Sequence, residues 1–217
     1  MKEVAIESLP NCFGIHGENI IPEFNYGKGR TDLVFVNISK DYWHHRTERL
    51  DLSKPIPNNK YLISFLQLHG SDPITKKYFF EKGAQPKYKK RNALEWLKKN
   101  NFVVKTDSGK IRTAQNLRRH VTTSIAVELK LDKWKDALRQ ASMGRSFAEY
   151  RYVAIDACHV EPAYENIGKF KSNNVGLISI NESGKAKIHW RPDRGNPYSD
   201  FYQWKVNETS ISEIEVY

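Results

Sequence analysis

The stretch IAVELKLDKW (125–134) places a carboxylate and an ammonium group on one side of a predicted strand. In an extended chain Glu128 and Lys130 point to one face, and the apolar residues that alternate with them point to the other. A solvated face with an ion pair would account for this pattern without any chemistry. Asp32, early in the strand candidate TDLVFVN (31–37), adds a second carboxylate and makes a catalytic interpretation available.

Strands that carry these residues can bring two carboxylates and an amine to a common edge of a sheet. Two carboxylates within a few ångströms repel each other, which favours a divalent cation between them. Oxygen ligands suit Mg²⁺ or Mn²⁺, which can activate water and stabilise charge on a phosphate. Lys130 could orient the nucleophile or offset the charge of the transition state. Asp32, Glu128 and Lys130 therefore predict a site for phosphodiester hydrolysis.

Three segments carry a family resemblance: GRTDLVFV (29–36), AVELKL (126–131) and the predicted helix WKDALRQA (134–141). Together they resemble the PD-(D/E)XK nuclease superfamily, which includes restriction endonuclease-like and Holliday-junction resolvase-like proteins. The resemblance covers residues 18–38 and 120–181. It implies that Asp32 and Glu128 bind the metal with the main-chain carbonyl of Leu129, that Lys130 is the catalytic lysine, and that Gln140 faces the site.

The sequence departs from the family pattern in three places. Thr31 stands where the family has its nominal proline, and Asp32 is much farther from Glu128 along the chain than is usual. Many members carry a further glutamate before the first of these strands. Glu18 and Glu23 are both candidates for that additional metal ligand, and the sequence leaves the choice open.

The long separation between the two acids is filled by a strongly basic segment. Residues 58–117 contain thirteen Lys or Arg and four Asp or Glu, so this segment holds +9 of the net charge of +10. Such a concentration of positive charge predicts an anionic partner.

The same segment predicts three short helices and a hairpin, in KYLISFLQLHG (60–70), SDPITKKYFFEKG (71–83), QPKYKKRNALEWLKKNN (85–101) and FVVKTDSGKIR (102–112). Asp72 as a cap and Pro73 at the first helical position are expected to begin the second helix. This order is typical of a winged helix-turn-helix, with the third helix as recognition helix and the hairpin as wing. A small helical subdomain whose lysines only aid solubility is the alternative. The expected DNA contacts are Lys87, Lys89, Lys90, Arg91, Asn92, Lys105 and Lys110.

The remaining chain predicts an α/β (α+β) domain with a mixed sheet flanked by helices, of restriction endonuclease-like type. Strands are expected at 20–27, 31–37, 124–131, 150–156 and 175–181. Helices are expected after Asp132, which can cap the first of them, and at 164–174. Pro22 places the first strand at an edge or delays its start. The predicted organisation is a discontinuous nuclease-like domain (1–57 and 118–217) interrupted by a winged-helix insertion (58–117).

Composition narrows the setting in which the protein works. No apolar run approaches the roughly 18 residues that span a bilayer, and the first ten residues lack a signal-peptide pattern. The two cysteines show no CxxC spacing, and neither His44-His45 nor Cys158-His159 has a second pair at zinc-binding spacing. These features predict a reduced, cytoplasmic protein that does not contact a membrane.

The sequence thus predicts a Mg²⁺-dependent deoxyribonuclease, with an endonuclease favoured over an exonuclease. The expected partner is duplex DNA, and a homodimer is favoured because one active site cuts one strand. Two alternatives stay open: a non-catalytic winged-helix DNA-binding protein on a nuclease-like scaffold, and an RNA-directed nuclease. A winged helix leans toward duplex DNA, but basic charge alone does not separate DNA from RNA.

Overall fold

A computed structural model describes residues 1–16, 18–27, 29–57, 59–114 and 117–214, which divide into two compact units. The sheet unit comprises Met1–Ile38, Val121–Val206 and the C-terminal residues from Glu213. The helical unit comprises Ser39–His120 and Asn207–Ser212. The predicted insertion (58–117) falls within the helical unit, which also takes in neighbouring residues on both sides and a short piece of the C-terminal helix.

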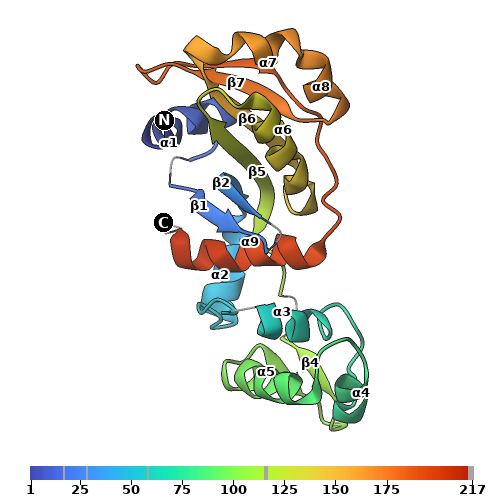
Figure 1. Cartoon of the computed structure of the whole chain (residues 1–217). Helices are drawn as coiled ribbons and strands as arrows, with labels where there is room; N and C mark the ends of the chain where they lie inside the picture. The colour runs from blue at the N-terminus through green and yellow to red at the C-terminus, as the bar shows by residue number, and fades with distance from the viewer. Residues whose placement is uncertain (17, 28, 58, 115–116, 215–217) are drawn as a thin grey trace. The chain divides into compact units, whose positions relative to one another are not determined.

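A six-stranded mixed sheet forms the centre of the sheet unit, with strand order β1-β2-β5-β6-β7-β8 (Figure 1). The β1–β2, β2–β5 and β7–β8 pairs are antiparallel, while β5–β6 and β6–β7 are parallel. The strands are β1 Ile20–Asn25, β2 Arg30–Ile38, β5 Val121–Lys130, β6 Tyr150–Asp156, β7 Gly176–Ile180 and β8 Ala186–Trp190. The prediction of a mixed α/β arrangement is confirmed, and β1, which contains Pro22, lies at an edge.

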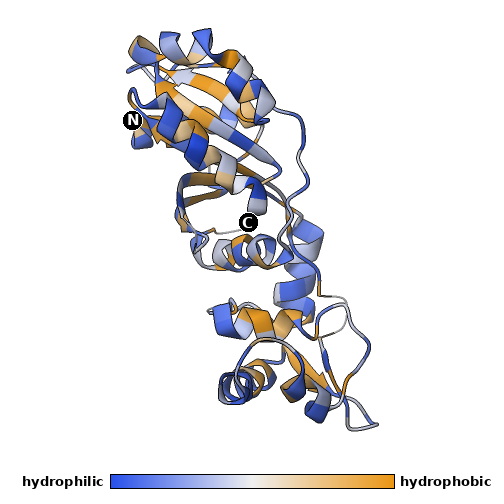
Figure 2. Ribbon diagram, turned by 45° about the vertical axis from the view of Figure 1, so that its right-hand side comes forward, coloured by the Kyte–Doolittle hydropathy of each residue, from blue (hydrophilic) through white to orange (hydrophobic). Residues whose placement is uncertain are grey.

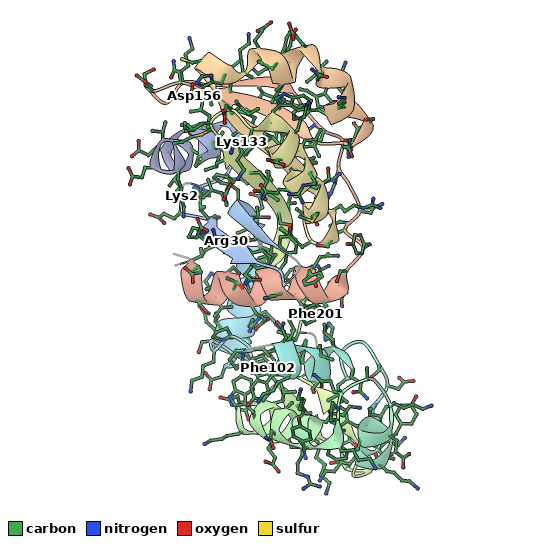
Figure 3. All side chains as sticks on the ribbon, viewed as in Figure 1. Lys2, Arg30, Phe102, Lys133, Asp156 and Phe201 are labelled. Carbon is green, nitrogen blue, oxygen red and sulfur yellow. The ribbon has the colours of Figure 1, made fainter. Side chains whose placement is uncertain are left out.

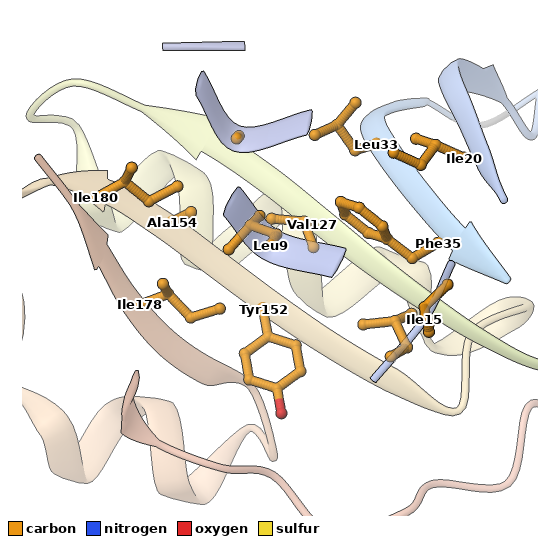
Figure 4. Close-up of a cluster of buried hydrophobic side chains, with 12 residues drawn as sticks. Leu9, Ile15, Ile20, Leu33, Phe35, Val127, Tyr152, Ala154, Ile178 and Ile180 are labelled. Atoms are coloured by element: carbon orange, nitrogen blue, oxygen red, sulfur yellow. The ribbon is translucent and has the colours of Figure 1, made fainter. Parts of the chain in front are cut away.

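Helices cover both faces of this sheet. They are α1 Lys2–Phe13, α6 Trp134–Met143, α7 Glu161–Glu165, α8 Ile167–Ser172 and α9 Asp200–Glu213, of which α9 continues into the helical unit. Leu9 of α1 packs with Leu33, Phe35 and Val127 on one face, as Figure 4 shows. The strands are correspondingly apolar in Figure 2, because both of their faces are covered.

The opposite face of the sheet packs against α6. Trp134, Ala137, Leu138 and Ala141 form one buried stripe at helical spacing and contact Val153 of β6. The predicted cap at Asp132 is wrong, since α6 begins at Trp134 after Lys133 and has no side-chain cap. The helix α1 is absent from the sequence-based expectations, because β-strand candidates dominate the first fifty residues.

The helical unit contains the predicted order of three helices and a hairpin. Its elements are α2 Lys40–His44, a π-helix His45–Arg49, α3 Asn59–Leu66, α4 Lys76–Glu81, α5 Lys87–Lys99, β3 Val103–Lys105 and β4 Ile111–Thr113. The hairpin turn is closed by hydrogen bonds from Thr106 N–H to Lys110 O and from Gly109 N–H to Thr106 O. Gly109 has a φ of +78°, which favours glycine at this position.

The start of α4 differs from the prediction. Thr75, whose hydroxyl accepts a hydrogen bond from Tyr78 N–H at 3.2 Å, caps the helix in place of Asp72. Pro73 precedes the helix, because Ile74 forms an antiparallel bridge with Ile111 of the hairpin. This bridge delays the start of the helix by about one turn.

A buried ion pair fixes the end of α9 that belongs to the helical unit. Arg46 donates to both carboxylate oxygens of Glu208 at 2.7 Å, and its Nε donates to Leu52 O at 3.0 Å. Ile56 N–H donates to the same carboxylate at 2.8 Å. Arg46 is 0% exposed, so this network is part of the core. None of the helices in the described ranges combines the length and apolar character needed to cross a bilayer.

Candidate active site

The β2–β5 pairing brings the two predicted acids together. Leu33 lies opposite Val127 in the antiparallel register, so the next positions along the two strands, Asp32 and Glu128, also face each other. Side chains at directly opposed positions share a face, with Cβ atoms about 4.5–5.5 Å apart. Asp32 Oδ2 accepts a hydrogen bond from Leu129 N–H at 2.8 Å, which holds its carboxylate against β5.

Glu128 is buried, and its environment disfavours the charged form. Its side chain is 2% exposed, and its Oε1 has no hydrogen-bond partner among the described residues. Burial and, to a smaller extent, the neighbouring charge of Asp32 raise the pKa of Glu128 to about 8, while Lys130 and Thr31 act in the opposite direction. Without a cation, this environment therefore favours the protonated form of the carboxyl group.

Lys130 shares the face of Glu128, since the two residues are two apart on one strand. Its side chain is half-buried at the end of β5. Because its charge lowers the pKa of Glu128, its ammonium group lies within electrostatic reach of that carboxyl. The structure thus brings Asp32, Glu128 and Lys130 to one end of two adjacent strands.

Gln140 lies on α6, the helix that packs against the Glu128 face of the sheet. Its side chain is half-buried, and its Oε1 is buried without a hydrogen-bond partner in the described part of the chain. The amide therefore has an acceptor available for a ligand.

Neither candidate for the additional acid joins the pair. Glu18 is exposed ahead of β1. Glu23 has a φ of +53°, and its carboxylate contacts Lys2 Nζ at 2.7 Å and Arg30 Nε at 2.8 Å; both bases are labelled in Figure 3. The described residues contain no group of three or more His, Cys, Asp or Glu side chains arranged for a metal ion. The site therefore offers two carboxylates.

Tyr26 is a residue of this site that the sequence analysis missed. It is 2% exposed, and its hydroxyl has no partner among the described residues. Burial raises its pKa, and the charge of Glu128 adds to the effect, so the phenol faces the same environment. Gly29 leaves room for its ring, since a Cβ at that position would lie 2.5 Å from the Tyr26 hydroxyl. Arg139, exposed on α6, lowers the pKa of Tyr26 and adds a positive charge nearby.

The predicted DNA contacts in the helical unit divide into two groups. Lys87, Lys89, Arg91 and Asn92 are exposed on α5, and Lys105 and Lys110 are exposed at the hairpin. Lys90 is 1% exposed, and its Nζ donates to the carbonyls of Phe79, at 2.9 Å, and Lys82. The prediction that Lys90 contacts DNA is therefore wrong.

Helical periodicity explains the burial of Lys90. It lies four residues before Leu94 and seven before Leu97, so it falls on the buried stripe of α5. Burial lowers its pKa, and its ammonium group donates to the two carbonyls and lies near the ring of Phe79. The sequence contains this helical spacing, but Lys90 was grouped with its basic neighbours and predicted to be exposed.

Comparison with known proteins identifies no relative. No protein-family model matches the chain, and neither a curated protein nor a solved structure matches it. The function is therefore argued from the geometry of the site itself.

Proposed function

We propose that this protein is a metal-dependent nuclease that hydrolyses phosphodiester bonds in DNA. The observation that carries the proposal is the opposition of Asp32 and Glu128 across β2 and β5, with Lys130 on the same face. The resemblance to the PD-(D/E)XK superfamily rests on these residues and gives them the same roles. The mixed sheet with helices on both faces is consistent with it.

The donor set fits a divalent cation. Mg²⁺ is commonly bound by one or two carboxylates and keeps several waters. Asp32 and Glu128 supply two carboxylates, and the buried Oε1 of Glu128 has no partner among the described residues. Leu129 would supply a main-chain carbonyl, as the resemblance implies, while its N–H orients Asp32. When bound, Mg²⁺ or Mn²⁺ lowers the pKa of a water ligand and stabilises negative charge on a phosphate.

The protein residues have separate tasks in the proposed reaction. Glu128 must lose its proton before it can act as a ligand, and its raised pKa makes this step dependent on pH. Lys130 offsets charge that develops on the phosphate. Gln140 has an acceptor, unpartnered among the described residues, that can orient a water molecule. Asp32 is held in place by Leu129, so its oxygen needs little reorganisation.

The helical unit supports the choice of DNA as substrate. Its three helices and hairpin have the order of a winged helix-turn-helix, and we infer that α5 is its recognition helix. Exposed Lys87 and Lys89 would bind phosphates, and Arg91 and Asn92 would read bases. Lys105 and Lys110 on the wing would bind phosphates. Cleavage of both strands would require two copies of the chain, which is the reason to propose a homodimer.

The decisive experiment is a cleavage assay with labelled duplex, nicked and branched DNA and with RNA, in Mg²⁺, Mn²⁺ or EDTA. Asp32→Asn, Glu128→Gln and Lys130→Ala should each abolish cleavage while DNA binding persists, because affinity comes mainly from phosphate contacts elsewhere. Glu182→Gln and Lys187→Ala, which alter exposed residues, are matched controls and should cut normally.

Three outcomes would redirect the proposal. Cleavage in EDTA would remove the metal from it, and cleavage by Lys130→Ala at the wild-type rate would remove Lys130. DNA binding without cleavage in any metal would support the non-catalytic alternative, and a preference for RNA would support the RNA-directed one.

A further inference from the structure

A pocket of about 520 Å³ in the sheet unit is lined, among the described residues, only by neutral and basic side chains. It lies between the C-terminal end of α6, the start of β6 and the turn that follows α8, and the rings of Tyr26 and Tyr198 also line it. Its positive groups are Arg145 and Arg151, neither of which belongs to the proposed hydrolytic site.

Arg151 is buried in the wall of this pocket without a counter-ion. It is 7% exposed, and its guanidinium donates to main-chain carbonyls, those of Ser142 at 3.4 Å, Asn173 at 3.2 Å and Asn174 at 3.0 Å. Within the described part of the chain no carboxylate forms an ion pair with it. Carbonyl oxygens satisfy hydrogen bonds, but they do not neutralise the charge, so the wall keeps a positive potential.

Arg145 adds a second positive charge to the same pocket. It is exposed, and its guanidinium lies 5.7 Å from the centre of the Tyr198 ring. The described residues provide no ion pair for it either. Burial and, second to it, the charge of Arg145 lower the pKa of Arg151, so the two guanidinium groups act on each other. Two like charges in a pocket without an acid are unfavourable until an anion binds between them.

We propose that this pocket binds the phosphate group of a nucleotide. Arg145 and the charge of Arg151 attract the phosphate, and a guanidinium can donate two parallel hydrogen bonds to it. Tyr198 is 63% exposed at the pocket, so its ring is available to stack with a base. A pocket of this volume exceeds the size of a lone phosphate, which favours a nucleotide over an inorganic ion.

The phosphate can come from either of two sources, the 5′-terminal phosphate of a DNA strand or a free nucleotide. The proposal needs only binding at Arg145 and Arg151, so it does not depend on hydrolysis at Asp32 and Glu128. The full-length chain in EDTA would be titrated against a short 3′-fluorescein oligonucleotide, with and without a 5′-phosphate. Thymidine 5′-monophosphate would be titrated separately by calorimetry.

Wild-type protein should bind the phosphorylated oligonucleotide about tenfold more tightly than the unphosphorylated one, as expected for one charge-assisted contact. Arg145→Gln should remove this preference, and Lys185→Gln, which removes an exposed charge in the β7–β8 turn, should keep it. Competition by thymidine 5′-monophosphate would identify a free nucleotide as sufficient. Absence of competition with a retained 5′-phosphate preference would identify the strand end.

Equal affinities for the two oligonucleotides, with no heat from thymidine 5′-monophosphate, would overturn the proposal. So would a 5′-phosphate preference that survives in Arg145→Gln. Arg151→Lys provides a second test, because it keeps the buried charge that attracts the phosphate. It should retain the preference for the 5′-phosphate, while the loss of hydrogen bonds to the carbonyls of Ser142, Asn173 and Asn174 should lower the unfolding temperature. Loss of the preference in this variant would contradict a role for the charge alone. Absence of DNA cleavage by the wild-type protein would leave all of these outcomes unchanged.

Discussion

In the helical unit the buried guanidinium of Arg46 meets the carboxylate of Glu208 through two hydrogen bonds of 2.7 Å. In the sheet unit the buried carboxyl of Glu128 faces a second acid, and its Oε1 has no partner among the described residues. Both groups are charged in water and nearly inaccessible here. The first has its charge and its hydrogen bonds matched. The second has its charged form disfavoured by burial and by Asp32 and keeps one oxygen without a partner in the described part of the chain, which is the arrangement expected where a ligand completes the site.

The same contrast separates basic residues. Lys90 is buried with two carbonyl acceptors, while Lys87 and Lys89 on the same helix are exposed. Arg151 is buried with carbonyl acceptors but shares a pocket with another arginine. Burial alone therefore does not distinguish a structural charge from a functional one. What sets Arg151 apart is the second positive charge, Arg145, which lines the same pocket.

The largest expected change in stability comes from breaking the buried ion pair of Arg46 and Glu208. Arg46→Met should destabilise the helical unit by about 3–5 kcal/mol, because Glu208 would remain buried without its partner. The double variant Arg46→Met/Glu208→Met should recover most of this stability. Urea denaturation of the wild type and the variants measures both values. A decrease below about 1 kcal/mol in the single variant would place the ion pair among weak surface pairs.

Glu128→Gln should change the free energy of unfolding in the opposite direction and stabilise the protein. The folded-state pKa of Glu128, about 8, lies above the ordinary value of 4.5, so the folded protein binds more protons than the unfolded chain between these pH values. Stability contributed by this group is therefore present at low pH and is lost as pH rises from 4.5 to 8. Each pKa unit corresponds to about 1.4 kcal/mol, so the variant should be more stable than wild type at pH 8 by up to a few kcal/mol.

The measurement is the free energy of unfolding at pH values between about 4.5 and 8.5, with Glu182→Gln as the exposed control. In the presence of Mn²⁺ the order should reverse, because the metal stabilises only the chain that retains the carboxylate. If Glu128→Gln were less stable than wild type at about pH 8 without metal, the charged form of Glu128 would not be disfavoured in the folded protein, which would contradict this prediction.

The stability contributed by His120, in the helical unit, should depend on pH in the opposite direction to that contributed by Glu128. It is 0% exposed, its Nε2 lies 2.8 Å from Ser210 Oγ, and its ring packs edge-on against Trp43. Burial lowers its pKa from 6.5 to about 3, with a smaller contribution from Arg46. Below pH 6.5 the unfolded chain binds a proton that the folded chain does not, so stability is lost as pH falls from 6.5 toward 3.

Hydrogen exchange measured by mass spectrometry can follow the two units separately over this range. Exchange should become faster in peptides around His120 as the pH falls below 6.5, after correction for the intrinsic rate. Peptides of β2 and β5 should gain protection as the pH falls from 8 toward 4.5. If exchange changed in the same direction in both sets of peptides, the titrations of His120 and Glu128 would not act separately on the two units.

Lys90→Met should lower the stability of the helical unit by no more than about 1 kcal/mol, because the carbonyls of Phe79 and Lys82 keep the side-chain amide of Gln67 as a donor. It should leave the salt dependence of DNA binding unchanged, since Lys90 is not exposed. Denaturation and fluorescence anisotropy across a salt series measure the two properties. A reduced salt slope in this variant would show that Lys90 reaches DNA after all.

The smallest effect is expected at the exposed face of α5. Lys87→Ala with Lys89→Ala should leave stability within about 0.5 kcal/mol of wild type. The slope of log K against log salt should fall by roughly 0.9 for each phosphate that the variant no longer neutralises. Lys185→Ala and Lys187→Ala, which remove two exposed charges from the sheet unit, form the matched control pair. An unchanged slope in the α5 variant would mean that this helix does not lie on DNA.

Most strands of the sheet, and the presence of Asp32 and Glu128 on two of them, were predictable from the local pattern of apolar and polar residues. The strands TDLVFVN and YRYVAID and the alternation in AVELK match β2, β6 and β5, because buried strands read as apolar or alternating runs. The hairpin turn and the third helix were also predictable, because glycine favours turns and the buried residues of α5 recur at helical spacing. Helix starts were less predictable, because Thr75 was preferred to Asp72 through a contact between Ile74 and Ile111 that is distant in sequence.

The sequence by itself determined which residue types carry charge, their alternation along β5 and the concentration of positive charge in residues 58–117. Only the tertiary structure decided which of those charges is buried, which has a partner, and which lies opposite another. Asp32 and Glu128 become neighbours through strand register, Lys90 is removed from the surface by the packing of α5, and Arg151 shares a pocket with Arg145. The physical reason is that desolvation and charge pairing depend on groups distant in the chain, so no local pattern can encode them.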